Sequence, residues 1–449
     1  MNPTTESLYA QCPQPDTEYD VIVAGGGPAG IGAALGAAMN GARTLILEAR
    51  SQFGGTATAA MWMEINFLFK DNIETSRGGV HALLIDAIRA WGPDASVAGR
   101  RTADRPGSGG NLDVHPEYLK KVIFDLYEQY GVDYQLYSPV VDVVKKGVTV
   151  TGVGIQAKEG RVTYRAKQVI DATGDGDVAW LAGCEMATQG DETTGWRPPA
   201  TVAWALGNVD IDRLYTWLET GIELDRHQFN HLHDLIREYR AQGYNLPGWL
   251  GVYKTTIPGV LSVNSGTSLE LSLDCSQSES LTLLEKMAID QALEFVRLCR
   301  EKKLPGLEEV YLMRTGGYAM ARDTRRLVGV YQFTNKDVME GTDFEDAIAT
   351  KYGGSDPVGE QREYTGIKQG AKFPYRALLP KVIDGLLVAG RNSSATMLGH
   401  YGGKSMGNMI SVGQGAGVAA ALCAQKDVQP RELDYRLIQQ QLDELGVSL

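Results

Sequence analysis

The 449-residue chain contains no run of 18 apolar residues, no CxxC pair and no excess of positive charge. Without such a run no membrane-spanning helix is expected, and the polar first 20 residues lack the apolar centre of an export signal. Five scattered cysteines predict neither a disulfide framework nor a thiolate metal site, so a reducing cytoplasm is the expected location. A net charge of −12 argues against nucleic acid as a partner, because binding to phosphates needs a basic face.

Glycine, by contrast, is abundant: it makes up 53 of the 449 residues, roughly 12% against a usual ~7%. Because glycine lets the backbone approach another group closely, several such approaches are expected. The chain is too long for one ordinary hydrophobic core. We therefore expect two domains, with three as the alternative, and enough interior to bury a large cofactor.

The opening of the chain predicts one βαβ unit. Residues 19–24 have the pattern of a buried strand, residues 30–40 that of an Ala-rich helix, and residues 44–47 that of the next strand. Farther on, an amphipathic helix is expected over residues 116–130. The alternating runs on either side of Gly160 predict a small antiparallel sheet.

Between the first strand and the helix, Gly25, Gly27 and Gly30 form the pattern GxGxxG. We expect Gly25 to permit a tight turn, Gly27 to leave room for a pyrophosphate, and Gly30 to let helix and strand pack closely. Glu48 closes the second strand 18 residues after Gly30, where its carboxylate suits ribose hydroxyls. The alternative is a glycine-rich turn that binds nothing.

Further stretches of small residues lie far apart in the sequence. They are SQFGGTAT at 51–58, VIDATGDGDVAW at 169–180, GLLVAGR at 385–391 and GQGAGVAAAL at 413–422. Stretches so distant from one another suit a long, extended ligand. We expect Gly413, Gln414 and Gly415 to form the first turn of the last helix, and a tightly packed core helix is the alternative.

The order of these motifs resembles the FAD-dependent oxidoreductases with the glutathione-reductase-type FAD fold, nearest the fumarate reductase and succinate dehydrogenase flavoproteins. The resemblance covers most of the chain and is weakest over residues 191–304. It implies an α/β fold, in which a Rossmann-like FAD-binding domain with a parallel sheet and a small antiparallel sheet carries an inserted α+β cap domain. The expected FAD-binding domain comprises residues 1–60, 111–190 and 363–449, and the expected substrate or cap region comprises residues 61–110 and 191–362.

The resemblance also implies which residues hold FAD. The pyrophosphate is expected at the first glycines, the adenosine ribose at Glu48, the adenine at Val140 and the flavin near Gly55 and Thr56. The turn from Gly413 is expected at the N1 edge of the flavin, where a helix N-terminus stabilises negative charge. Attachment is expected to be non-covalent, because SQFGG lacks the histidine of covalently linked relatives. The full expected set is Gly25, Gly27, Pro28, Ala29, Gly30, Glu48, Ala49, Gly55, Thr56, Val140, Ala172, Thr173, Gly174, Gly390, Arg391, Gly413, Gly415 and Ala416.

The segment GHYGGKSMGNM, residues 399–409, predicts a substrate site. In the resembling flavoproteins a histidine and, four residues on, an arginine hold the substrate carboxylate before a Gly-Asn-Ser turn. Here His400 and Lys404 have that spacing, but lysine lacks the planar fork of arginine, so an anionic or carbonyl group is expected rather than a dicarboxylate. With Tyr401, His400 is a candidate to bind or deprotonate substrate, since an imidazole pKa near 6.5 suits proton transfer. A histidine merely hydrogen-bonded in a loop is the alternative.

A second polar cluster lies in RTGGYAMARDTRRLVGVY, residues 314–331. By the same resemblance, Arg322 or Arg325 is a candidate to deliver a proton from the cap domain, although most of these arginines are expected to form ion pairs where the domains meet. His227, His231 and His233 have metal-like spacing, but no HExxH accompanies them and no metal is expected. The aromatic residues Trp62, Phe67 and Phe69 are expected in the core or in a pocket wall.

The sequence thus predicts an FAD-dependent dehydrogenase or reductase that moves a hydride between a small organic substrate and flavin N5. A flavin monooxygenase is the alternative within enzymes, and Gly390-Arg391 departs from the Gly-Asp pair expected there. An FAD-containing protein of tRNA modification and a flavin-holding structural or sensor subunit are alternatives of other classes. No second Rossmann motif for a nicotinamide is present. The substrate, the reaction direction, the electron partner and the oligomeric state, a homo-oligomer included, stay open.

Overall fold

The computed structural model describes residues 17–61, 63–66, 76–98, 111–219, 230–267, 271–352 and 370–449, and the single residues 13 and 68.

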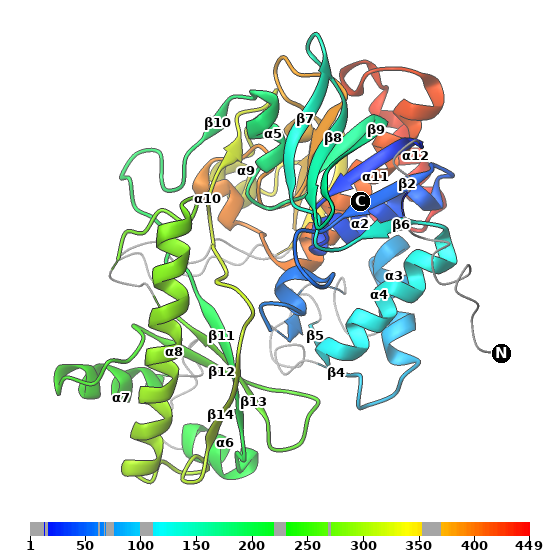
Figure 1. Ribbon diagram of the computed structural model, residues 1–449. Coiled ribbons are helices and arrows are strands. Elements are labelled where there is room, and N and C mark those ends of the chain that lie inside the picture. Colours follow the sequence, from blue (N-terminus) through cyan, green and yellow to red (C-terminus); the bar gives the residue numbers. More distant parts are fainter. Residues whose placement is uncertain are drawn as a thin grey trace.

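A seven-stranded mixed sheet forms the centre of the molecule, in the order β6-β2-β1-β9-β8-β7, with β18 beside the end of β9 (Figure 1). The sheet changes character within β9. The first half of that strand pairs antiparallel with β8, and its end runs parallel to β1 and β18. The strands are β1 (Glu18–Ala24), β2 (Thr44–Leu47), β6 (Asp133–Gln135), β7 (Val140–Lys146), β8 (Thr149–Ala157), β9 (Gly160–Asp171) and β18 (Leu386–Val388).

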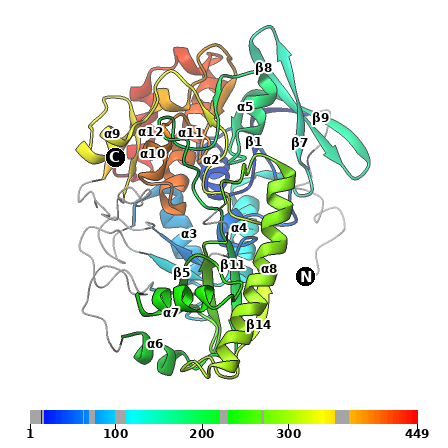
Figure 2. The same ribbon diagram turned by 90° about the vertical axis from the view of Figure 1, so that its left-hand side faces the viewer.

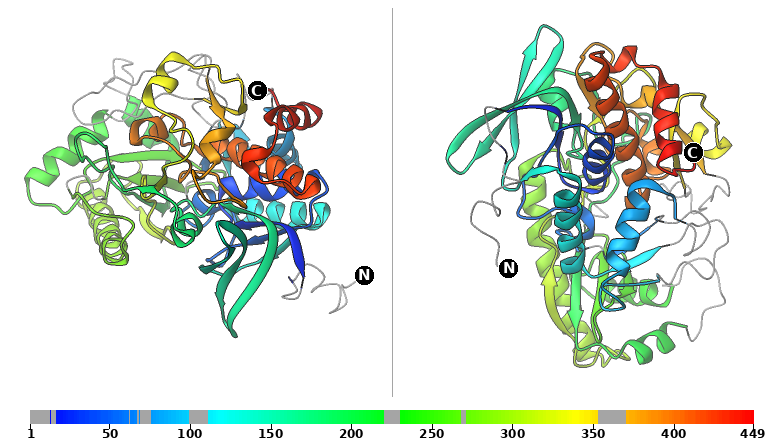
Figure 3. Two further views of the ribbon diagram at one scale, coloured as in Figure 1. Left: turned by 90° about the horizontal axis from the view of Figure 1, so that it is seen from above. Right: turned by 90° about the vertical axis from the view of Figure 1, so that its right-hand side faces the viewer.

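The central strand β1 is buried on both faces, as expected for a parallel strand. Val21 and Val23 point into a core shared with α2 (Pro28–Met39) and α11 (Met406–Lys426). Ile22 and Ala24 point into a second core, shared with α5 (Asp177–Ala182) and the β7–β8–β9 ribbon. In Figure 3, the blue helix α2 and the orange-red helix α11 lie side by side against one face of the sheet. The predicted βαβ unit and the antiparallel sheet are both present.

Further helices extend the first core. The predicted helix α4 (Pro116–Tyr130) buries Leu119 and Val122 in it, begins with proline at its first position and ends at Gly131 in a left-handed conformation. The other elements on this side are α3 (Gly79–Arg89), α12 (Tyr435–Glu444), η1 (Gly55–Ala57), η3 (Tyr375–Leu378), η4 (Pro430–Glu432) and the small sheet β3-β5-β4, with β3 (Glu64–Ile65), β4 (Ser96–Ala98) and β5 (Leu112–Val114).

A second layered unit lies at the opposite end of the molecule from the β7–β8–β9 ribbon (Figures 1 and 2). Its four-stranded antiparallel sheet packs against the long helix α8 and has its own core, in which Trp204 contacts Phe295 edge to face. The elements are β11 (Val202–Gly207), β12 (Leu250–Lys254), β13 (Leu261–Ser265), β14 (Tyr311–Thr315), α6 (Ile211–Glu219), α7 (Asn230–Ala241) and α8 (Ser278–Glu301). This is the α/β fold with an additional α+β unit that the sequence predicts.

The remaining described elements are short. They are β10 (Met186–Ala187) with β15 (Arg326–Leu327), β16 (Ala347–Lys351) with β17 (Ala371–Pro374), α9 (Asn335–Glu340) and α10 (Met397–Tyr401). The domain limits stay a prediction, but two segments expected in the cap region pack elsewhere. Helix α3 and strand β16 contribute Val80 and Ile348 to the core that contains α2 and α11. None of the helices in the described ranges is long and apolar enough to cross a membrane.

Candidate cofactor and substrate site

The turn between β1 and α2 requires glycine at two of its three motif positions. Gly25 has φ +100°, and a Cβ there would overlap the carbonyl of Ala172, whose carbon would lie 2.7 Å away. A Cβ at Gly30 would overlap the carbonyl of Gly25, with the carbon 2.9 Å away. Because backbone atoms cannot move aside as a flexible side chain can, both glycines serve the fold, as their predicted roles require.

Gly27 is different, because no described residue demands glycine there. Its φ of −75° is open to any residue, and no heavy atom of the described residues lies within 4 Å of the place where a Cβ would be. Other glycines with such open surroundings, Gly131 and Gly183, have positive φ. Gly27 is the N-cap of α2 and makes no side-chain cap, so the first N–H groups and the positive end of the helix dipole face this space. The residues fit a pyrophosphate.

Glu48 follows β2 and is held rigidly. One carboxylate oxygen accepts a hydrogen bond from the N–H of Gly26 at 2.7 Å and the other from the N–H of Arg50 at 2.8 Å, and the residue is 6% exposed. The N–H of Ser138 donates to the Glu48 carbonyl at 2.8 Å, which brings the chain before β7, and with it Val140, alongside. The predicted ribose and adenine positions are therefore neighbours.

The segment after β2 closes over the same turn. A Cβ at Gly55 would lie 3.0 Å from the Cα of Gly27 and 3.6 Å from the hydroxyl of Tyr318. Tyr318 also hydrogen-bonds with Thr56, and the guanidinium of Arg50 lies 3.8 Å from the centre of its ring. The sequence placed Tyr318 only in a polar cluster of the cap region. No motif marks it as a neighbour of the glycine turn.

At the end of β9 a buried carboxylate organises the next expected contacts. Asp171 is fully buried and accepts hydrogen bonds from the N–H and hydroxyl of Thr173 and from the N–H of Ala179. Burial raises the pKa of Asp171, and these hydrogen bonds partly offset it. Sequence reasoning missed Asp171, although a charged residue that ends an apolar strand was a usable signal.

The carboxyl end of β18 lies next to the end of β9. A Cβ at Gly390 would lie 3.0 Å from the Cβ of Ala29, and one at Gly174 would lie 3.4 Å from the Arg391 guanidinium. Arg391 forms an ion pair with Asp175. The carboxyl ends of β1, β9 and β18 thus meet in front of α2, the usual ligand position in such sheets.

The predicted start of the last helix is wrong. Helix α11 begins at Met406, so Gly413 and Gly415 lie in its second and third turns and are buried. A Cβ at Gly413 would overlap the carbonyl of Ala29, with the carbon 2.7 Å away, and one at Gly415 would lie 2.9 Å from the side chain of Ile348. These glycines let α11 pack closely on α2 and β16, as in the alternative interpretation, and Ala416 is buried in the same core.

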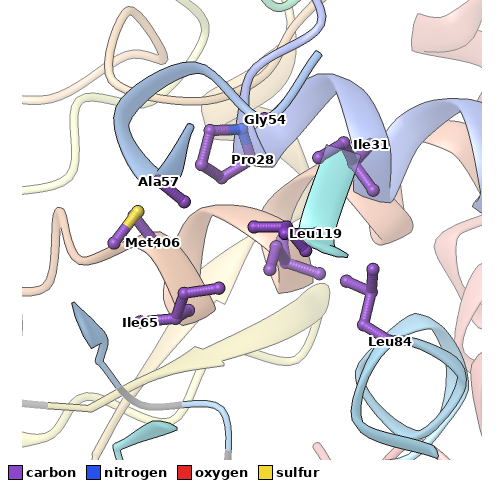
Figure 4. A pocket seen from close by; sticks show the side chains of 9 residues that line it. Pro28, Ile31, Gly54, Ala57, Ile65, Leu84, Leu119 and Met406 are labelled. Atoms are coloured by element: carbon purple, nitrogen blue, oxygen red, sulfur yellow. The ribbon is translucent and has the colours of Figure 1, made fainter. Parts of the chain in front are cut away.

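The true N-terminus of α11 nevertheless lies beside the glycine turn. Met406 lines a cavity of about 20 Å³ together with Pro28 of α2, Ala57 of η1 and Ile65 (Figure 4). The cavity is apolar and has room for about one water, so it is not itself the place of a dinucleotide. Its lining shows that α2, η1 and the first turn of α11 converge.

The substrate-side residues His400 and Tyr401 lie in the short helix α10, not in a loop as expected, because Thr396 caps its N-terminus. His400 is 2% exposed, and its Nε2 lies 3.2 Å from the carbonyl of Arg322, so this nitrogen donates. The amine of Lys404 lies 3.5 Å from the centre of the Tyr401 ring. Three of the four predicted catalytic residues therefore adjoin one another, and Arg322 joins them through its backbone.

The electrostatics of His400 differ from the expectation. Burial, followed by the charges of Lys351 and Lys404, holds the pKa of His400 well below its ordinary 6.5. The imidazole is therefore neutral at pH 7, which corrects the expected pKa near 6.5.

Two of the four arginines of the second cluster form ion pairs, whereas the sequence predicted ion pairs for most of them. Arg325 pairs with Asp177, and the fully buried Arg326 pairs with Asp323 and, at 2.7 Å, with Glu192. Within the described ranges Arg322 forms no ion pair, and its guanidinium lies 3.3 Å from the amide oxygen of Asn264. Arg322 rather than Arg325 thus stays a candidate proton carrier.

Some predicted residues lie outside the described part of the chain. They are Trp62, Phe67, Phe69, His227 and the side chains of His231 and His233. Among the described residues, no group of three or more histidine, cysteine, aspartate or glutamate side chains is placed to hold a metal ion.

Fold and site together define an α/β protein in which a glycine turn and the carboxyl ends of parallel strands form a candidate dinucleotide site. The chain matches the family of FAD dependent oxidoreductases over residues 20–442 and belongs to that family. It is an enzyme, and FAD is its cofactor. The finer likeness to fumarate reductase and succinate dehydrogenase flavoproteins stays a prediction.

Individual relatives resemble parts of the chain. Digeranylgeranylglycerophospholipid reductase of Picrophilus torridus is 30% identical over 165 residues, 35% of this chain and 40% of the relative. The tRNA uridine 5-carboxymethylaminomethyl modification enzyme of Aquifex aeolicus is 30% identical over 167 residues, 35% of this chain and 24% of the relative. The chain thus spans less than half the length of either. The solved p-nitrophenol 4-monooxygenase of Pseudomonas putida shares 14% identity with a TM-score of 0.49, over 95% of this chain and 83% of that one.

Proposed function

We propose that this enzyme is a dehydrogenase or reductase that transfers a hydride between a small organic substrate and N5 of FAD, while a side chain of the protein handles the accompanying proton. FAD supplies the two-electron chemistry when bound. One observation carries the proposal. Buried basic groups around α10 adjoin the strand ends expected to hold the cofactor. The Nε2 of His400 donates to the carbonyl of Arg322 at 3.2 Å, and two residues on, the hydroxyl of Thr324 accepts a hydrogen bond from Arg391 at 3.1 Å.

The cofactor path follows from the contacts around α2. Glu48 would accept hydrogen bonds from the ribose hydroxyls, and the N-terminus of α2 at Gly27 would hold the pyrophosphate. Gly55 and Thr56 would lie toward the flavin. We expect the first turn of α11 at Met406, rather than the predicted turn from Gly413, to lie next to the flavin ring. We expect the attachment to be non-covalent.

Substrate would lie against α10. Lys404 offers a point charge for an anionic or carbonyl group. Since the Nε2 of His400 is committed to a carbonyl, its Nδ1 is the nitrogen available to accept a proton or a hydrogen bond from substrate. Tyr401 orients Lys404 through its ring. Arg322, on the cap side, is the candidate that delivers the proton.

Anaerobic addition of candidate substrates to the purified holoenzyme tests this proposal. Hydroxy acids, amines, enoates and a polyprenyl lipid are added singly, the last because named relatives are lipid reductases. We expect one class to bleach the visible flavin band without NAD(P)H, or reduced enzyme to be reoxidised by an enoate. Reduction by NAD(P)H alone, followed by oxygen incorporation into product, would instead establish the monooxygenase.

Replacement of His400 by alanine then tests the substrate site. We expect turnover to fall by about 10²- to 10⁴-fold, the range for loss of a proton-transferring group, with FAD content unchanged. Turnover and substrate affinity near those of the wild type would remove His400 from the mechanism.

A further inference from the structure

A third basic side chain lies buried beside His400 and Lys404. Lys351 is the last residue of β16 and is only 2% exposed. Its stem runs along the chain just before Lys404, since a Cβ at Gly403 would lie 3.0 Å from its Cβ and 3.2 Å from its Cε. The amine lies 5.0 and 4.9 Å from the ring centres of Phe333 and Phe373. Within the described ranges it makes no hydrogen bond and no ion pair.

Packing does not explain a lysine at this position. A buried ammonium loses its hydration, and two aromatic faces replace only part of it. A methionine would fill the same space without that cost. Burial, and next the charge of Lys404, lower the pKa of Lys351 to about 7. Burial is the largest cause that lowers the pKa of His400, and the charges of Lys351 and Lys404 lower it further.

The N-terminus of α11 adds to the same positive region. Ser405 is the N-cap of this 21-residue helix, and among the described residues its side chain makes no cap and its buried hydroxyl has no hydrogen-bond partner. The positive end of the helix dipole and an unpartnered hydroxyl therefore adjoin Lys404. A buried polar atom left unpaired is costly, so a missing acceptor is the simplest reason for it.

We propose that Lys351, Lys404, His400 and the first turn of α11 bind one oxyanion group, a carboxylate or a phosphate, of the substrate, and that Lys351 makes the site selective for this class. The inference rests on the proposed function, whose substrate it describes. The bound oxyanion neutralises the buried ammonium and accepts hydrogen bonds from the amines and from the Ser405 hydroxyl. A neutral substrate of the same shape leaves the buried ammonium of Lys351 unpaired and is rejected.

Calorimetric titration of the holoenzyme tests this site without any turnover. Oxalate and inorganic phosphate are the probes, and neutral oxamide is the control ligand. We expect an oxyanion to bind and oxamide not to bind, and the probe that binds tells a carboxylate site from a phosphate site. Lys351→Met should weaken oxyanion binding at least tenfold with unchanged FAD content. Lys336→Met, at an exposed lysine of α9, should bind like the wild type.

Lys351→Gln, which keeps polarity without charge, should behave like Lys351→Met. Unchanged affinity in both variants, or no oxyanion binding by the wild type, would overturn the inference. The two proposals fail separately. Lysine-dependent binding without hydride transfer to any oxyanionic substrate would contradict only the proposed function, whereas turnover of a neutral substrate with Lys351-independent affinity would contradict only this inference.

Discussion

Replacing Gly27 by alanine distinguishes a glycine that serves the cofactor from those that serve the fold. The alanine Cβ would enter open space at an ordinary φ of −75°. The lost backbone freedom of the unfolded chain stabilises the variant by about 0.4–1 kcal/mol. Alanine is a poorer N-cap, which costs a similar amount, about 0.5–1 kcal/mol. The free energy of unfolding of the apoprotein should therefore change by less than about 0.5 kcal/mol.

FAD binding should respond quite differently. A methyl group at this position fills the space against which the pyrophosphate would lie and separates it from the N–H groups of α2. Loss of one or two hydrogen bonds to a charged group, each worth about 1.5–3 kcal/mol, weakens binding by roughly 10- to 1,000-fold or more. Urea unfolding of the apoprotein and fluorescence titration with FAD measure the two quantities separately.

Gly30→Ala is the matched control, because its Cβ would overlap the carbonyl of Gly25. We expect this variant to lose about 1–3 kcal/mol of stability or more through overpacking, before any effect on FAD. A Gly27→Ala protein that binds FAD as tightly as the wild type would refute the placement of the pyrophosphate. A Gly27→Ala apoprotein as unstable as Gly30→Ala would refute the interpretation of the open space.

Three further changes test the packing and the buried charges. Gly417→Ala should destabilise the apoprotein by about 1–3 kcal/mol in urea unfolding, since its Cβ would overlap the carbonyl of Ala33; an unchanged midpoint would contradict the close helix crossing. Burial lowers the pKa of Lys351 in the folded state to about 7, from its ordinary 10.5. Between these two pH values the unfolded state therefore binds more protons than the folded state. The free energy of unfolding should rise from pH 7 to pH 9 by up to about 2 kcal/mol. Thermal unfolding should show this rise in the wild type but not in Lys351→Met, and equal pH profiles would count against the lowered pKa. Asp323→Ala should cost about 3–5 kcal/mol by leaving Arg326 buried without its main partner, and a loss below 1 kcal/mol would show that Glu192 suffices.

The cofactor turn could be predicted because its signal is local. One βαβ unit contains all four residues of the motif, Gly25, Gly27, Gly30 and Glu48. The expected role of each follows from its position in that unit. An apolar run likewise predicted β1, the helical spacing of apolar residues predicted α4, and their alternation predicted the antiparallel ribbon. In these segments the burial pattern depends on a periodicity that a few neighbouring residues already define.

Residues whose neighbours are distant in the sequence could not be placed in this way. A run such as GQGAGVAAAL has the same composition whether it faces a ligand or another helix, and only the presence of α2 against Gly413 decides. Tyr318 and Lys351 belong to segments with no cofactor motif. Tyr318 lies near Gly55, and Lys351 lies near Lys404, because the chain returns from the second unit to the first.

The N-termini of α2 and α11 are staggered along the helix axes, because α11 begins earlier than the sequence predicted. Gly413 and Gly417 oppose Ala29 and Ala33, so α2 and α11 run in the same direction with their backbones in contact. Helix α2 begins one residue before this contact, whereas α11 begins seven residues before it, at Met406. At 1.5 Å per residue, the start of α11 extends about 9 Å farther along its axis than the start of α2. Two positive helix ends staggered by this length suit an anionic pyrophosphate at one end and a flavin ring at the other. The glycines buried between the helices set that stagger, and we therefore predict that they support FAD binding only indirectly.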